Sequence, residues 1–128
     1  MKFDHAALQV LNMDRAIAFY TEKLKFSLDH RAINHEEQEE YAFISAGSVR
    51  IELIQDLTDD YKLPLLKKPF CPHLCMEVDD LEEAVRGLNV MEIPILRGPL
   101  KIENEETWVY FSDPDHNVLE FIQWYNKK

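Results

Sequence analysis

Two histidines and two glutamates recur at one spacing along the chain, and together they could bind a divalent metal ion. His5 and His73 are 68 positions apart (73 − 5), and Glu52 and Glu120 are separated by the same number (120 − 52). Imidazole nitrogens and carboxylate oxygens suit divalent ions such as Ni, Co, Zn and Mn. Four such ligands leave positions open for water or a substrate. These four residues are therefore the candidate metal ligands.

The same offset relates apolar positions, which indicates an internal duplication. It recurs at the pairs Val10 and Val78, Ala16 and Ala84, Phe43 and Phe111, and Ile54 and Ile122. A chance match would not hold one register across a strand, a helix and two further strands. We therefore expect two copies of one module, at about residues 1–57 and 71–125, joined by a linker near residues 58–70.

Each copy is expected to fold as strand, helix, strand, strand, strand, which is an α+β arrangement. Apolar periodicity predicts strands over residues 3–10, 26–34, 40–45 and 49–55 and a helix over residues 13–24 in the first copy. In the second copy it predicts strands over residues 71–78, 93–96, 107–112 and 117–124 and a helix over residues 81–89. Asn12 or Asp14 can cap the first helix, and Asp79 or Asp80 the second.

A module of roughly 60 residues is marginal alone, so each copy must bury a sheet face against a partner module. Alternate strand residues share a face, and Glu120 alternates with Val118 and Ile122, which suggests that its face is covered. A covered carboxylate is costly without a cation or hydrogen-bond donors. One strand histidine alone would be an ordinary satisfied or exposed residue, but the recurrence in both copies favours a metal site. Approximate twofold symmetry can bring the two pairs to one point.

Composition excludes several classes of partner. The chain has 128 residues, of which 46% are hydrophobic, enough for one domain or two closely packed modules. The formal net charge of −10 argues against nucleic acid and anionic membranes. We expect a soluble, cytoplasmic protein, since no long apolar run and no signal-like start are present. Cys71 and Cys75 lie too close on one predicted strand to form a disulfide, and small strand cysteines are more often buried than metal ligands.

Several motifs resemble those of the vicinal oxygen chelate superfamily, which includes glyoxalase I, methylmalonyl-CoA epimerase, extradiol dioxygenases and fosfomycin resistance enzymes. They are Asp4-His5, the helix from Arg15 to Tyr20, Ile51-Glu52-Leu53, Pro72-His73-Leu74, Gly98-Pro99-Leu100-Lys101, and Phe111 to Asp115 leading to Leu119-Glu120-Phe121. The resemblance covers essentially the whole chain. It implies a single domain, residues 1–128, of two tandem βαβββ modules that form an open, cupped barrel around a metal site. It also implies a homodimer with sites near the subunit interface.

The ligand order His, Glu, His, Glu looks most like glyoxalase I (lactoylglutathione lyase) of the small bacterial type. That resemblance implies a metal-dependent lyase or isomerase that shifts a proton through a metal-bound enediolate of a 2-hydroxy or 2-keto thiol adduct, such as a glutathione hemithioacetal. Glu120 or Glu52 would carry the proton, with Glu120 slightly favoured. The alternatives within the superfamily are an extradiol-type dioxygenase, which would use Fe(II), an epimerase, and a non-catalytic small-molecule binding protein of the drug-resistance type.

The chain departs from the glyoxalase pattern where glutathione would be held. Members that use glutathione commonly carry an arginine on the first strand and an asparagine after the second ligand, where Gln9 and Asp56 stand here. Asp56 would repel a carboxylate, so a different thiol adduct or another 2-hydroxy or 2-keto compound is as good an expectation. Lys25 and His116 stand where the family usually has glycine, which concerns turn geometry.

Three basic residues are candidates for substrate binding. Arg50 lies two residues from Glu52 on the same strand face and could hold an anionic substrate, although an ion pair with a neighbouring acid is the favoured interpretation. Arg97 and Lys101 flank Gly98-Pro99, where the resemblance implies a substrate-facing loop. Ordinary surface charges are an equally good interpretation of these two.

Overall fold

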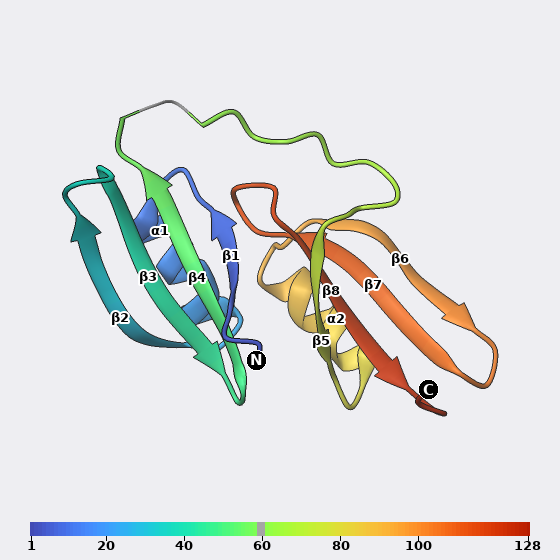
Figure 1. Cartoon of the computed structure of the whole chain (residues 1–128). Coiled ribbons are helices and arrows are strands. Elements are labelled where there is room, and N and C mark those ends of the chain that lie inside the picture. Colours follow the sequence, from blue (N-terminus) through green and yellow to red (C-terminus); the bar gives the residue numbers. More distant parts are fainter. Residues whose placement is uncertain (59–60) are drawn as a thin grey trace. The chain divides into compact units, whose positions relative to one another are not determined.

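The computed structural model describes residues 1–58 and 61–128, which divide into two compact units, Met1–Leu63 and Pro64–Lys128. We call them the N-terminal unit and the C-terminal unit. Each contains one four-stranded sheet, and a helix packs on one face of it (Figure 1). The predicted α+β class and the βαβββ plan of both modules are confirmed, and both sheets are open.

The N-terminal unit has the strand order β1-β4-β3-β2, with β1 and β4 parallel and the other neighbours antiparallel. Its elements are β1 (Ala6–Gln9), α1 (Met13–Ala18), the π-helix η1 (Phe19–Lys23), β2 (Ser27–Asn34), β3 (Glu39–Ala46) and β4 (Val49–Asp56). Alternate residues of the two central strands, Ala42 and Ile44 on β3 and Ile51 and Leu53 on β4, are buried. They form the core with the buried side of the helix.

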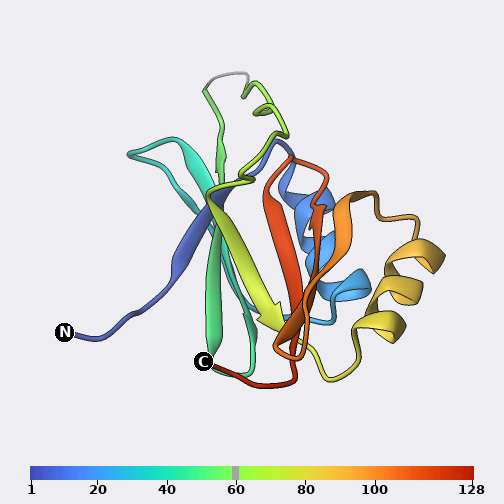
Figure 2. The ribbon, with the colours of Figure 1, turned by 90° about the vertical axis from the view of Figure 1, so that its right-hand side faces the viewer.

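The C-terminal unit repeats this topology with the order β5-β8-β7-β6, and β5 is parallel to β8. Its elements are β5 (His73–Glu77), α2 (Leu81–Val90), β6 (Ile95–Ile102), β7 (Glu106–Ser112) and β8 (Val118–Trp124). The view in Figure 2 shows α2 along one side of this sheet. Leu88, Val109, Phe111 and Leu119 are fully buried, so the core again lies between helix and sheet.

The helices begin at equivalent residues. Asn12 Oδ1 accepts a hydrogen bond from the Arg15 amide at 2.9 Å, and Asp80 Oδ1 accepts one from the Glu83 amide at 3.1 Å. Of the predicted alternatives, Asn12 and Asp80 are therefore the caps, and they are 68 positions apart (80 − 12).

The predicted helix over residues 13–24 is partly wrong, because α1 gives way to a π-helical turn. The Leu24 amide donates to the Phe19 carbonyl, five residues back, at 3.2 Å. Such a turn accommodates one extra residue. After it, the bond from Phe26 N to Tyr20 O (2.9 Å) corresponds to the bond from Ile93 N to Leu88 O (2.9 Å). Phe26 and Ile93 are 67 positions apart (93 − 26), so the offset of 68 is not constant.

The changed offset also corrects one of the predicted pairs. Phe43 lies opposite Glu52 in the β3–β4 ladder, and Tyr110 lies opposite Glu120 in the β7–β8 ladder. Phe43 therefore corresponds to Tyr110 and not to Phe111, which is buried in the core on the other face. A shift of one residue reverses the face of a strand side chain. The β7–β8 turn is one residue longer than the β3–β4 turn, because Ser112 pairs with Val118 whereas Ser45 pairs with Arg50, and this restores the offset of 68.

Two strand predictions need correction. The strand predicted over residues 93–96 is β6, Ile95–Ile102, so Gly98-Pro99 lies within a strand and not in a loop. The ladder is irregular there, and Gly98 has φ +109°, with a hypothetical Cβ only 3.0 Å from the Trp108 carbonyl oxygen. The first predicted strand is shorter than expected, so His5 precedes β1, as Cys71 precedes β5.

The segment between β4 and β5 contains no helix or strand among its described residues, and residues 59–60 of the predicted linker lie outside the described part of the chain. Both cysteines are free thiols. Among the described residues, no helix is both long enough and apolar enough to cross a membrane.

Candidate functional site

Each unit brings together its own histidine and glutamate. His5 Nε2 lies 3.4 Å from Glu52 Oε1, and His73 Nε2 lies 2.9 Å from Glu120 Oε1. The parallel pairing of the first and last strands of each module explains this, because it sets Ala7 opposite Glu52 and Cys75 opposite Glu120. Each glutamate thus pairs with the residue two positions after the histidine. His73 lies within β5, where alternate residues share a face, and His5 immediately precedes β1.

The second ring nitrogen of each histidine faces a hydrogen-bond acceptor. His73 Nδ1 lies 3.0 Å from the Phe70 carbonyl oxygen, and His5 Nδ1 lies 2.6 Å from Asp4 Oδ2. Since a backbone carbonyl can only accept, Nδ1 of His73 carries a hydrogen, and Nε2 is the ring nitrogen that faces the Glu120 carboxyl. Metal-binding histidines usually donate their other N–H to a carboxylate or backbone carbonyl in this way. The hydrogen bond from His5, with help from the Arg50 charge, holds the pKa of the Asp4 carboxyl below its ordinary value.

An aromatic ring packs against the imidazole of each histidine. The rings of His5 and Phe43 are 5.2 Å apart at 86°, and those of His73 and Tyr110 are 5.4 Å apart at 74°. Both are edge-to-face arrangements, which aromatic pairs favour. The equal placement supports the correspondence of Phe43 with Tyr110 that the strand registers define.

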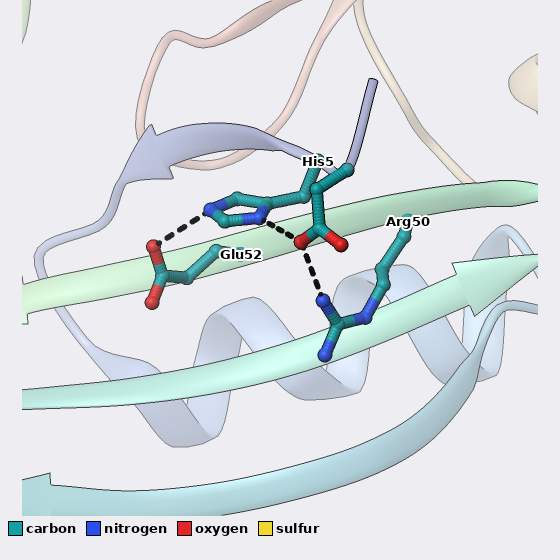
Figure 3. A network of polar contacts seen from close by, with 4 residues as sticks. His5, Arg50 and Glu52 are labelled. Carbon is teal, nitrogen blue, oxygen red and sulfur yellow. Dashed lines mark hydrogen bonds and ion pairs between the residues drawn. The ribbon is translucent and has the colours of Figure 1, made fainter. Parts of the chain in front are cut away.

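A further group covers each aromatic ring. The Arg50 guanidinium lies 3.9 Å from the Phe43 ring centroid. It also donates a hydrogen bond to Asp4 Oδ2 at 2.8 Å (Figure 3). In the C-terminal unit, the ring of Phe70 packs on that of Tyr110 with centroids 5.2 Å apart. The ion pair expected for Arg50 is therefore confirmed, and a substrate role for Arg50 remains a prediction.

The two glutamates differ in their surroundings. The Glu120 side chain is 9% exposed and that of Glu52 is 20% exposed. Burial raises the pKa of Glu120, and the charge of His73 opposes this rise in part. Burial, followed by the charge of Glu120, also raises the pKa of Tyr110, and the same two causes raise the pKa of the Cys75 thiol to about 12. The C-terminal pair is the more enclosed one.

Within each unit, the distance between the two candidate donor atoms can be compared with the ligand spacing around a divalent ion. Two ligand atoms about 2.1 Å from one ion, at angles between about 90° and 109°, are about 3.0 to 3.4 Å apart. The His5–Glu52 distance of 3.4 Å lies at the upper end of this range, and the His73–Glu120 distance of 2.9 Å lies just below its lower end. Within either unit, the described residues include no group of three His, Cys, Asp or Glu side chains that could hold an ion, so each unit brings together two of the four predicted ligands.

Sequence reasoning missed the groups that support the imidazoles. In the sequence, Asp4 stands out only as part of the Asp4-His5 motif and Phe70 only as the last residue of the expected linker. Neighbouring strand residues point to opposite faces, so Asp4 would have been placed away from His5. Because both residues precede β1, that alternation does not apply to them.

Arg97 and Lys101 lie on the edge strand β6, not in the expected loop. Lys101 Nζ pairs with Glu103 at 3.0 Å, and both side chains are 72% exposed. Their part in substrate binding remains a prediction.

The chain belongs to the Glyoxalase/Bleomycin resistance protein/Dioxygenase superfamily, whose family model matches residues 2–121. Among its relatives, the mitochondrial methylmalonyl-CoA epimerase of Bos taurus is 29% identical over 88% of this chain and 67% of its own. A probable lactoylglutathione lyase of Vibrio cholerae is 26% identical over 93% of this chain and 88% of its own. These relatives differ in named activity, so they define the superfamily and not one reaction.

Solved structures agree with the fold. A glyoxalase family protein from Bacillus cereus superposes with a TM-score of 0.79 at 20% identity, covering 97% of this chain and 94% of that one. The trypanothione-dependent glyoxalase I of Leishmania major gives a TM-score of 0.75 at 23% identity, covering 93% and 84%. At these identities the similarity establishes the fold alone.

Proposed function

We propose that this chain is a metal-dependent lyase or isomerase of the glyoxalase I type, which moves a proton between adjacent carbons of a 2-hydroxy or 2-keto thiol adduct. The observation that carries this proposal is the recurrence of one His–Glu pair in both units, at 3.4 and 2.9 Å, each with the other ring nitrogen held by an acceptor. A single such pair would be an ordinary polar contact. The recurrence favours a ligand set.

The four donors His5, Glu52, His73 and Glu120 would serve one divalent ion of Ni, Zn, Co or Mn, with both pairs drawn from one chain or from two chains of a homodimer. When bound, such an ion supplies positive charge that polarises substrate oxygens and acidifies the neighbouring carbon. The chain's own contribution is to hold both imidazoles with Nε2 available. A small-molecule substrate of this kind needs no oxidant, because the reaction only relocates a proton.

Glu120 would carry that proton. Its carboxylate would accept the proton from one substrate carbon and return it to the next, as a general base and then a general acid. Its side chain is the less exposed of the two, at 9% against 20% for Glu52, which limits exchange of the held proton with water. Glu52 would keep its place as a ligand and would not transfer the proton.

An epimerase is the second candidate. The relationship to the bovine methylmalonyl-CoA epimerase, at 29% identity, favours it. So do Gln9 and Asp56, which stand where glutathione-using members carry an arginine and an asparagine. The elementary step would be the same removal of a proton beside a carbonyl, with the proton returned to the opposite side of the same carbon.

Turnover by metal-free protein reconstituted in turn with Ni, Co, Zn, Mn and Fe(II) tests the proposal. The substrates are the methylglyoxal–glutathione hemithioacetal and a 2-methyl-branched acyl-CoA, assayed in deuterated water so that proton removal is seen directly. Glu120→Gln, which removes the proposed general base, should lower turnover by about 10²- to 10⁴-fold while metal stays bound. Glu52→Gln, which removes a proposed ligand carboxylate, should also lower turnover. Asp29→Asn, at an exposed position on β2, is the matched control. Full activity in both glutamine variants would contradict the mechanism, and activity only on the acyl-CoA would select the epimerase.

A further inference from the structure

Four side chains of the N-terminal unit form a closed ring of contacts around the Nδ1 side of His5. Asp4 Oδ2 accepts from His5 Nδ1 at 2.6 Å and from the Arg50 guanidinium at 2.8 Å (Figure 3). Arg50 in turn lies 3.9 Å above the Phe43 ring, and that ring stands edge-on to the His5 imidazole at 5.2 Å. The ring of contacts joins the segment before β1 to β3 and β4.

This arrangement sets the protonation of the imidazole. Nδ1 faces an ionised carboxylate, which can only accept, so the neutral ring of His5 carries its hydrogen on Nδ1. Nε2 faces Glu52 at the longer distance of 3.4 Å, so the shorter contact of 2.6 Å favours the hydrogen on Nδ1. A carboxylate on the second nitrogen also increases the basicity of the ligating one.

In the C-terminal unit, different groups place an acceptor at Nδ1 of the histidine. Position 72, which corresponds to Asp4 (72 − 4 = 68), is a proline without a side-chain acceptor. There the Phe70 carbonyl accepts from His73 Nδ1 at 3.0 Å, and the Phe70 ring packs on Tyr110, the counterpart of Phe43. Both units therefore place an acceptor at Nδ1 of the histidine, a carboxylate in the N-terminal unit and a backbone carbonyl in the C-terminal unit.

Fold stabilisation does not account for the ionic version. The Asp4 and Arg50 side chains are 70% and 41% exposed, and ion pairs so open to water contribute little to stability. The contact instead orients a partly buried ring.

We propose that Asp4, fixed by Arg50, is a positioning residue that holds His5 in the Nδ1–H tautomer and presents Nε2 to the divalent ion. This inference rests on the proposed function, because it takes His5 to be a metal ligand. Asp4 does not itself contact the ion or the substrate.

Imidazole ¹⁵N–¹H correlation spectra of the metal-free protein at about pH 8 test the tautomer independently of any activity. His5→Gln assigns the His5 signals among the five histidines. Wild-type His5 should be in the Nδ1–H form, Asp4→Ala should shift it toward Nε2–H, and Asp4→Asn, which keeps an acceptor oxygen, should restore Nδ1–H. His73 is an internal control, because its acceptor is the Phe70 carbonyl and its signals should stay unchanged. A wild-type His5 in the Nε2–H form, or one that Asp4→Ala leaves unchanged, overturns the proposal.

Competition titrations with Co(II) and Zn(II) then measure the consequence for metal binding. Asp4→Ala should weaken affinity by about 10- to 100-fold, with a smaller loss in Asp4→Asn. The exposed control Asp29→Ala should leave affinity unchanged, and unfolding curves confirm that each variant is folded. If His5→Ala weakens binding and Asp4→Ala does not, the present inference fails alone. If His5→Ala also leaves affinity unchanged, His5 is no ligand and the proposed function fails with it.

Discussion

Gln55 and Gln123 attach the helix of their unit to its sheet by the same bond. Gln55 Oε1 accepts from the Met13 amide at 2.8 Å, and Gln123 Oε1 accepts from the Leu81 amide at 2.8 Å. Both pairs keep the offset of 68 (123 − 55 and 81 − 13). The duplication therefore extends to hydrogen bonds that tie the first helical residue to the last strand.

We expect Gln55→Ala and Gln123→Ala each to lower the free energy of unfolding by about 1–3 kcal/mol. Met13 and Leu81 are 1% and 2% exposed, so their amides would lose a partner that water cannot readily replace. Urea unfolding measures the effect. Gln55→Glu and Gln123→Glu are the matched controls, because they keep an acceptor oxygen next to a helix N-terminus, where negative charge is favourable. Alanine variants as stable as the wild type would show that these bonds are dispensable.

Lys25 and Glu92 follow the two helices at equivalent positions. Both have a left-handed backbone conformation, with φ angles of 64° and 57°. Both residues are exposed. The left-handed conformation costs a non-glycine residue about 1–2 kcal/mol, and glycine avoids this cost but loses about 0.5–1 kcal/mol of chain entropy. Lys25→Gly and Glu92→Gly should therefore each stabilise the fold by about 0.5–1 kcal/mol in thermal or urea unfolding. Lys25→Ala and Glu92→Ala remove the same side chains without relieving the backbone and should give no gain; an equal gain from alanine would refute the backbone explanation.

Cys75 should react slowly with iodoacetamide in the metal-free protein although the residue is exposed. Desolvation and the charge of Glu120 raise the pKa of its thiol to about 12. Since the thiolate is the nucleophile, its fraction at about pH 8 is about 10³-fold below that of a thiol with the ordinary value of 9.0. The rate should rise tenfold per pH unit up to about pH 11. Mass spectrometry of the Cys71→Ala variant, with N-acetylcysteine as reference, measures it.

Removing the carboxylate of Glu120 provides the control for that experiment. Glu120→Gln should accelerate alkylation of Cys75, because the second cause of the raised thiol pKa is the charge of Glu120. If Cys75 is alkylated at a rate within tenfold of that of N-acetylcysteine when Glu120 is intact, the prediction is wrong.

Glu120 should also make the stability of the metal-free protein depend on pH. Burial raises its folded-state pKa above 4.5, so the folded chain binds this proton more tightly than the unfolded chain does. The resulting stabilisation is full below pH 4.5 and is lost as the pH rises through the folded pKa. The unfolding free energy of Glu120→Gln, relative to wild type, should therefore increase from acid toward alkaline pH in urea titrations with EDTA. Glu36→Gln, at an exposed turn residue, reports the background, and a flat difference between Glu120→Gln and wild type would disprove the effect.

Periodicity predicted the fold closely, because both modules alternate apolar and polar residues on their strands and keep an apolar helix side. Strands β3, β4, β7 and β8 and helix α2 lie within about one or two residues of their predicted ends. The π-helical turn was not predictable, since it differs from an α-helix by one hydrogen-bond partner and leaves the apolar pattern almost unchanged. The strand through Gly98-Pro99 was missed because glycine and proline together ordinarily indicate a turn.

The candidate site was half predictable. Spacing selected His5, Glu52, His73 and Glu120, and the parallel strand pairing places each pair within 3.4 Å. The matching of Phe43 with Phe111 failed because single-residue shifts cancel along the chain, so a constant offset at the ends conceals a different register in the middle. The acceptor at Phe70 is a backbone carbonyl, and no side-chain pattern could indicate it.

These cancelling shifts describe how the two halves could diverge after duplication. The histidine and glutamate of each half are brought together by the β1–β4 and β5–β8 pairings, whereas the length changes fall in the π turn, the outer strands and the connecting turns. Insertions and deletions there leave the donor pairs where they were. The outer hairpins can thus change in length while the inner strand pairs keep each histidine beside its glutamate.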